Sequence, residues 1–168
     1  ARGMDVAFVS PTGNLLCAMS DQPAEQGVEP FTALQLTTSY VRPRPDTQVP
    51  GKDHRFGFVS EETIDYLETH DDLECWAYSP LIQGAYDRDD RPLPEVYDHP
   101  GTTRRLSALR SVADELGAQP GQVVLSWLVQ GSPSMRPIVG ASSLEQLDAA
   151  LAAPQLSDDH MARLDSAR

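Results

Sequence analysis

The sequence predicts an α/β domain in which about four parallel strands are flanked by helices. Short apolar runs that end in turn residues alternate along the chain with segments of helical periodicity. A strand followed by a helix and a further strand normally pairs in parallel, because the helix carries the chain back across the sheet. The 168 residues suffice for one domain, and a hydrophobic content of 40% provides enough apolar side chains for a core.

Four apolar runs are expected to form the strands. The first is followed by Pro11, Gly13 and Asn14, and the third ends in the Ser-Pro corner of "CWAYSPLIQG", which is typical of a buried strand followed by a turn. Two long segments rich in proline, 42–57 and 84–101, are expected to be surface loops. The expected strands are residues 5–10, 30–36, 73–78 and 136–140.

Helix start and stop residues mark most of the segments between these runs. Ser60 is expected to cap one helix, and Thr102 or Thr103 the next, which should stop at Gly117. Pro120 suits the first turn of the helix that follows. The segments with helical periodicity are 14–27 (interrupted by Pro23), 59–72, 102–117, 120–131, 142–153 and 157–167.

The composition argues against several classes of function. A formal net charge of -12 disfavours nucleic acid and anionic membranes as partners, because both select basic surfaces. No run approaches the roughly 18 apolar residues that a membrane helix needs. Cys17 and Cys75 lie in apolar surroundings and are expected to be reduced core residues of a cytoplasmic protein. The four histidines lack metal-ligand spacing, so no metal site is expected.

Four segments in a fixed order resemble the C-terminal half of an aldo-keto reductase. They are "PFTALQ", "WAYSPL", "GAQPGQVVLSWLV" and "RPIVGASSLEQLDAAL", and the resemblance extends over roughly residues 5–165. Members of that family fold as a (β/α)8 TIM barrel of about 250 residues. The resemblance therefore implies half of such a barrel, built from the equivalents of strands five to eight.

The resemblance also implies a single truncated domain over residues 1–168. Residues 1–4 are interpreted as a possible tag remnant followed by a start Met. No residue matches the family's catalytic Asp, Tyr, Lys and His, which belong to the first half of the barrel, so the chain alone is not expected to reduce a carbonyl. NAD(P)H-linked carbonyl chemistry then requires a partner chain. The alternatives are a repurposed, cofactor-free biosynthetic enzyme of cyclase or isomerase type, and a non-catalytic binding or scaffold protein (a pseudoenzyme).

Part of a nicotinamide cofactor site is implied by the same resemblance, for NADP(H) or NAD(H), although the chain could also bind no cofactor. Tyr78 resembles the aromatic residue that stacks on the nicotinamide ring, and Ser10 and Gln35 resemble residues that contact its carboxamide. Pro11 stands where an Asn is expected after Ser10. The remaining implied contacts are Ser79, Leu81 and Gln83 on the pyrophosphate side, and Gly140, Ser142, Ser143 and Gln146 at the adenosine phosphate end.

Simpler structural roles remain open for several of these residues. Ser143 and Gln146 fit a capping box, which needs no ligand. The turn "GASSLEQ" contains no Lys or Arg, whereas a 2′-phosphate usually requires a cationic fork. Asp87 and its acidic neighbours are expected to form a solvated surface. Weak candidates for catalysis are Tyr78, Asp98 and His99, because loops at the carboxyl ends of strands carry the active sites of barrels.

Four strands of a barrel have two free edges, which a closed barrel does not have. The sequence therefore predicts association, with a homodimer ranked first and a complementary half-barrel chain as an alternative. The loop 42–57 could instead cover the edges. A small-molecule ligand is compatible with each arrangement.

Overall fold

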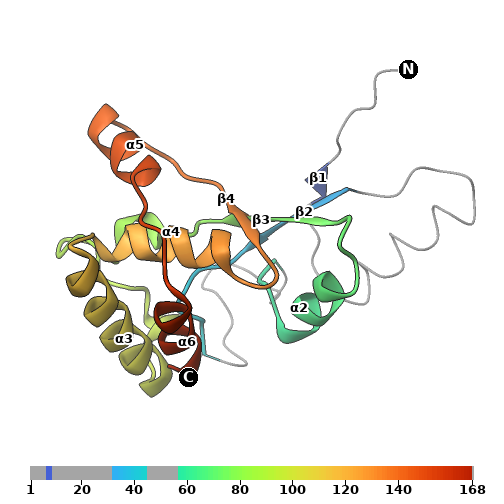
Figure 1. Cartoon of the computed structure of the whole chain (residues 1–168), viewed down its shortest axis with the longest axis horizontal. Helices are drawn as coiled ribbons and strands as arrows, with labels where there is room; N and C mark the ends of the chain where they lie inside the picture. Colours follow the sequence, from blue (N-terminus) through green and yellow to red (C-terminus); the bar gives the residue numbers. More distant parts are fainter. Residues whose placement is uncertain (1–6, 9–31, 45–56, 168) are drawn as a thin grey trace, which may run out of the picture.

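A computed structural model of the chain describes residues 7–8, 32–44 and 57–167. Its centre is a sheet of four parallel strands in the order β1-β2-β3-β4, which is also their order along the chain (Figure 1). The strands are β1 (Ala7–Phe8), β2 (Ala33–Thr37), β3 (Glu74–Tyr78) and β4 (Met135–Pro137). The predicted α/β fold with parallel strands and flanking helices, half of a (β/α)8 barrel, is confirmed.

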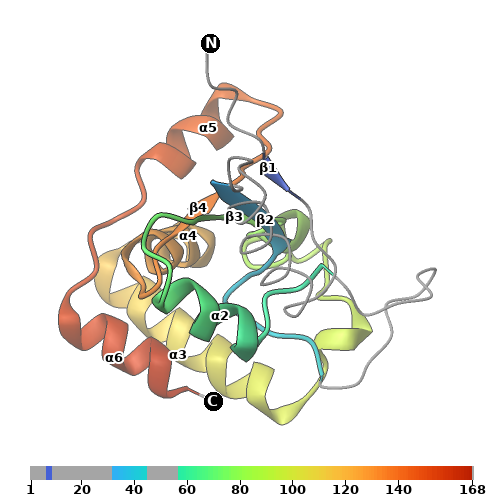
Figure 2. The same ribbon diagram turned by 90° about the vertical axis from the view of Figure 1, so that its right-hand side faces the viewer.

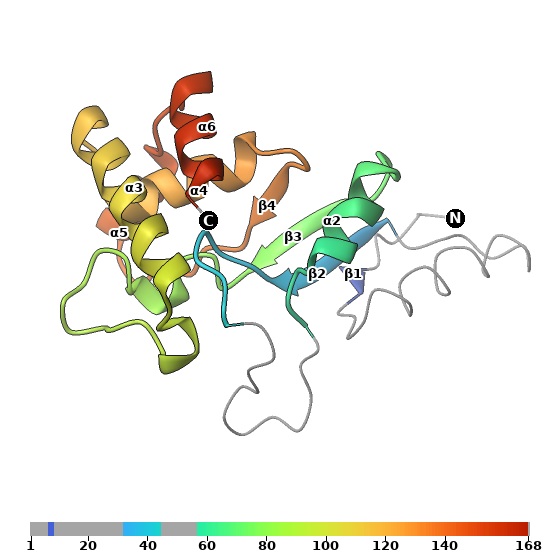
Figure 3. The same ribbon diagram turned by 90° about the horizontal axis from the view of Figure 1, so that it is seen from below.

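The helices lie mainly on one side of this sheet. Helix α2 (Glu61–Glu68) is beneath β2 and β3 in Figure 1 and in front of them in Figure 3. Helices α3 (Pro100–Leu116), α4 (Pro120–Gln130) and α6 (Asp158–Ser166) pack together on the same side (Figure 2). Helix α5 (Leu144–Leu151) projects away from this group (Figure 1).

Most predicted helix ends agree with the structure. Ser60 caps α2, and Gly117 ends α3 with a φ of 60°, a left-handed conformation that glycine adopts readily. The predicted cap of α3 at Thr102 or Thr103 is wrong. The helix begins earlier, because Pro100 occupies its first turn and His99 becomes the N-cap.

Strand boundaries differ by a few residues from the prediction. The fourth strand was expected at 136–140, but β4 ends at Pro137, and 138–143 form the connection to α5. Two short 3-10 helices lie in or next to the predicted loop 84–101. Glu95–Tyr97 lies inside the loop, and Ile82–Gly84 ends at its first residue. The rest of the first expected strand and the expected helix 14–27 lie outside the described residues.

The two faces of the sheet have different chemistry. Leu34, Cys75 and Met135 face the helices and belong to the hydrophobic core, because alternate residues of a strand point to the same side. Trp76 and Arg136 are register partners on the opposite face. Glu74, on that same face, accepts a hydrogen bond from the Trp76 indole at 3.0 Å and pairs with Arg136. None of the described helices is long and apolar enough to cross a membrane.

Tyr40 joins the segment after β2 to the end of the chain. Its side chain is fully buried, and its hydroxyl donates a hydrogen bond to the Leu164 carbonyl oxygen at 3.0 Å. The Arg105 guanidinium lies over the ring and donates to the Tyr40 carbonyl oxygen at 2.9 Å, and Trp127 packs edge-on against the ring. Burial raises the pKa of Tyr40 to about 12, so the hydroxyl keeps its donor proton at ordinary pH.

Tyr40→Phe should lower the free energy of unfolding by about 1–2 kcal/mol, because it leaves the Leu164 carbonyl without its donor. Urea denaturation measures the change. Tyr97→Phe is the matched control, since Tyr97 is also buried but its hydroxyl forms no hydrogen bond with the described residues, and its cost should stay below about 0.5 kcal/mol. Equal costs for the two variants would contradict the assigned role of the Tyr40 hydroxyl.

A surface ion pair joins α3 to α6. The Arg163 guanidinium donates to both carboxylate oxygens of Glu115, at 2.7 and 2.6 Å, and His160 lies 3.6 Å from the same carboxylate. The hydrogen bonds from Arg163 lower the pKa of Glu115 to about 2. A carboxylate whose folded-state pKa is depressed stabilises the fold above its ordinary pKa, and this stabilisation is lost as pH falls toward the depressed value.

We therefore expect the coupling between Glu115 and Arg163 to be present at pH 6 and to weaken progressively below about pH 4.5. A double-mutant cycle with Glu115→Gln and Arg163→Met, followed by denaturant unfolding at several pH values, measures this coupling. A coupling that is the same at pH 6 and pH 3 would show that the pair does not respond to protonation of Glu115.

Candidate functional site

A groove lies at the carboxyl ends of β3 and β4, with a cavity volume of about 760 Å³. Its walls come from the loop after β3, the first turns of α4, and the connection from β4 into α5. This end of a barrel sheet is where ligands bind in (β/α)8 enzymes. Most residues that the sequence predicted for a cofactor site line this groove: Tyr78, Ser79, Leu81, Gln83, Gly140, Ser142 and Gln146.

The other predicted contacts are not part of the groove lining. Gln35 is half-buried on β2, opposite Trp76 in the register of the sheet. Ser143 caps α5 beside the groove. Ser10 lies outside the described residues.

The loop after β3 has an unusual backbone. Ser79, Ile82 and Gln83 have φ values of 55°, 47° and 58°, in the left-handed region that L-residues seldom occupy. A β-branched residue such as Ile82 is especially rare there. Backbone strain of this kind is found most often at ligand sites, where surrounding contacts maintain it.

Buried hydroxyl groups hold this loop in place. The Ser39 hydroxyl lies 2.5 Å from the Pro80 carbonyl oxygen and 2.7 Å from the Tyr86 hydroxyl. The Tyr86 hydroxyl also accepts a hydrogen bond from the Val41 backbone N–H at 3.0 Å. Neither Ser39 nor Tyr86 was predicted from the sequence, because these contacts join residues that are more than 40 positions apart.

Asp87 connects the same loop to α4. Its carboxylate accepts a hydrogen bond from the Gly121 backbone N–H at 2.8 Å, which makes it an acceptor at the start of the helix. Partial burial raises the pKa of Asp87, and the hydrogen bond from Gly121 opposes this effect. A Cβ atom on residue 121 would lie 2.3 Å from an Asp87 carboxylate oxygen, so any larger residue here would displace the Asp87 side chain from this position. Asp87, Asp89 and Asp90 are all exposed, as the sequence predicted for a solvated surface, and the contact with Gly121 is an additional role of Asp87.

The turn before α5 forms the other side of the groove. The Ser143 hydroxyl accepts from the Gln146 backbone N–H at 3.3 Å, as a capping box predicts. The Gln146 side chain, however, accepts from the Ser142 backbone N–H at 2.8 Å. In a capping box it would accept from the N–H of the N-cap residue itself, which here is Ser143. At the far end of α5, the Gln122 amide donates to the Ala149 carbonyl oxygen at 2.8 Å and ties this helix to α4.

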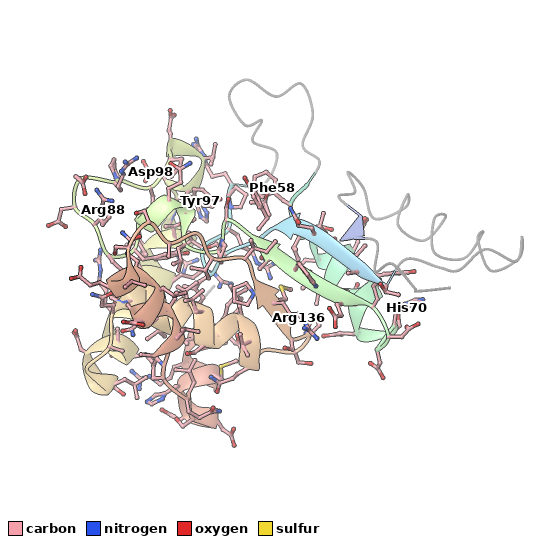
Figure 4. All side chains as sticks on the ribbon, turned by 90° about the horizontal axis from the view of Figure 1, so that it is seen from above. Phe58, His70, Arg88, Tyr97, Asp98 and Arg136 are labelled. Carbon is pink, nitrogen blue, oxygen red and sulfur yellow. The ribbon has the colours of Figure 1, made fainter. Side chains whose placement is uncertain are left out.

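The three weak catalytic candidates lie in different places. Tyr78 lines the groove, and 51% of its surface is exposed. Asp98 and His99 do not line it, and Figure 4 shows Asp98 beside Tyr97 in the segment before α3. His99 uses Nε2 for contacts with the Arg42 carbonyl oxygen at 2.9 Å and the Thr102 hydroxyl at 3.1 Å. These contacts give His99 a structural role, and a catalytic role for it or Asp98 stays a prediction.

The groove combines an aromatic ring with a Gly-Ser turn that leads into a helix. An exposed ring such as that of Tyr78 can stack on a flat ligand group, and the N–H groups at the start of a helix can bind an anion. Among the described residues no group of His, Cys, Asp and Glu is arranged to hold a metal ion.

Comparison with known proteins relates this arrangement to a family. The sequence is 36% identical over 108 residues to an uncharacterized oxidoreductase of Mycobacterium tuberculosis, over 57% of this chain and 33% of that protein. It is 42% identical over 66 residues to pyridoxine 4-dehydrogenase of Escherichia coli, over 38% of this chain and 23% of that protein. The matches thus span a third or less of these relatives.

Two solved structures share the fold. The thermostable aldo-keto reductase Tm1743, in complex with the inhibitor epalrestat, superposes with a TM-score of 0.55 at 21% identity, over 93% of this chain and 54% of that one. A Gox0644 mutant in complex with NADPH gives a TM-score of 0.57 at 16% identity, over 89% and 42% of the two chains. The sequence model of the aldo/keto reductase family matches residues 27–168. The chain therefore belongs to the aldo/keto reductase family.

Proposed function

We propose that the groove binds a nicotinamide dinucleotide and that the chain forms the cofactor-binding part of an NAD(P)H-linked carbonyl oxidoreductase. The observation that carries this proposal is the convergence of two separate loops. Residues after β3 and residues after β4, each predicted from the family resemblance to contact the cofactor, line one cavity.

The dimensions and chemistry of the groove support this ligand. Its volume of about 760 Å³ lies in the usual range of cofactor sites, roughly 300–1,000 Å³. Tyr78 offers a ring to the nicotinamide, and Leu81 and Leu125 provide apolar surface between the polar residues of the two loops. The Gly140 position has open space around it, since a Cβ there would meet no atom within 4 Å, so a ligand can approach the backbone closely.

Each side of the groove has a different task in this proposal. A bound dihydronicotinamide supplies a hydride to the carbon of a carbonyl substrate. Tyr78 covers one face of the nicotinamide ring and leaves the other face to the substrate. The strained loop 79–84, held by Ser39 and Tyr86, fixes the position of Tyr78 and Ser79 before the ligand binds.

The proposed reaction also needs a proton for the carbonyl oxygen. We place its donor on the remaining part of the barrel, in the same polypeptide or in a partner chain. A homodimer could close the sheet, but it would only duplicate this half of the barrel, so it would not supply the missing donor. Leu144 and Leu151 on α5 are 78% and 76% exposed, which supports this helix as a contact for the remaining part.

Titration of the purified chain with NADH, followed by the fluorescence of the dihydronicotinamide, tests the proposed binding. We expect saturable, micromolar binding, and Tyr78→Ala should weaken it about tenfold, since stacking on an aromatic ring contributes about 1–3 kcal/mol. Val129→Ala is the matched control. Its side chain is equally exposed, at 51%, but lies outside the groove, so the affinity should not change.

An absence of binding at millimolar cofactor would contradict the proposal and would favour the cofactor-free alternatives. Equal effects of Tyr78→Ala and Val129→Ala would place the binding site outside this groove.

A further inference from the structure

We infer that Phe58 forms the wall of the site against which the substrate packs, and that it selects carbonyl substrates with an aromatic ring over those with a carboxylate. The inference rests on the proposed function, because it assumes that a nicotinamide ring stacks on Tyr78. Phe58 pairs in parallel with Thr37, and Figure 4 shows it next to the carboxyl end of β2.

Two backbone hydrogen bonds fix the place of Phe58 in the sheet. The Thr37 N–H donates to the Gly57 carbonyl oxygen at 2.6 Å, and the Val59 N–H donates to the Thr37 carbonyl oxygen at 3.0 Å. Residues 57–59 therefore lie like a short strand beside the end of β2. Because paired residues of neighbouring strands point their side chains to the same face, Phe58 shares the face of Thr37.

Phe58 belongs to a row of uncharged side chains across the carboxyl end of the sheet. Thr37 pairs with Tyr78 in the register of β2 and β3, so Tyr78 shares this face. Ile138 continues the register on the other side of Tyr78, since its N–H donates to the Ala77 carbonyl oxygen at 2.9 Å. Tyr78 and Ile138 line the groove. The row therefore runs from the groove to Phe58.

Phe58 does not take part in the hydrophobic core. Its side chain is half-buried and is not among the described side chains that form the core or pack against it. The next residue, Val59, points to the other face and does pack against the core. An aromatic side chain without a core contact, at the end of a barrel sheet where ligands bind, is well placed to contact a ligand.

The length of the row fits one nicotinamide ring and one further flat group. Neighbouring strands are about 4.8 Å apart, so the backbones of Phe58 and Tyr78 are separated by about 10 Å across Thr37. Flat rings in contact lie about 3.5 Å apart. A nicotinamide ring on Tyr78 and an aromatic ring of the substrate on Phe58 make three such contacts, which fill this interval.

The charges near the row disfavour a carboxylate in the same place. The next row toward the amino ends of the strands contains Gln35, Trp76 and Arg136, and Arg136 is already paired with Glu74. The whole chain carries a net charge of -12. An anionic group of the substrate would thus lose water without gaining a cation from either row, whereas an aromatic ring would gain the contact with Phe58.

The test measures the binding of two methyl ketones to the chain saturated with NADH, by saturation-transfer NMR. Acetophenone and pyruvate share the carbonyl and methyl groups and differ in carrying a phenyl ring or a carboxylate. We expect acetophenone to bind about fivefold more tightly. Phe58→Ala should abolish this preference, and Phe58→Arg should invert it, because a guanidinium pairs with a carboxylate.

Val59→Ala is the matched control, because Val59 follows Phe58 directly but points to the opposite face. It should leave the preference for acetophenone unchanged. The affinity of each variant for NADH should stay within about twofold of the wild type, because Phe58 contacts the substrate and not the cofactor. A Phe58→Ala variant that loses NADH affinity instead would overturn this role.

The remaining outcomes distinguish this inference from the proposed function. If the wild type binds no NADH, the proposed function fails, and the inference fails with it, since no nicotinamide ring then lies between Tyr78 and the substrate. If NADH binds but acetophenone binds no more tightly than pyruvate, the inference alone is overturned. A preference that Phe58→Ala and Val59→Ala change equally overturns the assignment to Phe58.

Discussion

Parallel pairing of β3 with β4 is the constraint on which the candidate site depends. In a parallel sheet the carboxyl ends of neighbouring strands meet at the same edge, so the loops that follow Tyr78 and Pro137 are brought together although they are about 60 residues apart in sequence. The helices α3 and α4 fill this interval and carry the chain back across the sheet. Their buried side chains, such as Leu109 and Val124, belong to the same hydrophobic core as Cys75 of β3 and Met135 of β4, so the two helices hold these strands through packing.

The sequence predicted the fold well because local signals and the family resemblance agreed. The apolar runs indicate where strands lie. The caps Ser60 and Gly117 mark helix ends, because each acts through a local interaction. The predicted cap of α3 failed because two rules competed, and Pro100 at the first turn prevailed over the threonines that follow it. The end of β4 was misplaced because an apolar run gives no signal for where pairing with β3 stops.

The candidate site was predicted in the two segments that the family resemblance covers, which follow β3 and β4. Tyr78 and Gly140 were found from motifs that continue a strand into its loop, whereas Asp87 was interpreted as a solvated carboxylate. Its contact with Gly121 joins residues 34 positions apart, and neither residue stands in a recognisable pattern. The same applies to Ser39 and Tyr86, whose hydroxyls hold the loop. Contacts of this kind depend on tertiary packing, which composition and periodicity do not encode.

The helix starts at the groove explain how a chain with a net charge of -12 could hold the anionic part of a dinucleotide. Two helices, α4 and α5, begin at the groove, and each offers N–H groups that favour an anion. At α4 the Gly121 N–H is already bound to Asp87. At α5 the Ser143 hydroxyl accepts from Gln146, so the N–H groups of Leu144 and Glu145 remain without an acceptor among the described residues. One helix start is thus available to an anionic group of the ligand, on the side of the groove where the family resemblance implies the adenosine phosphate end.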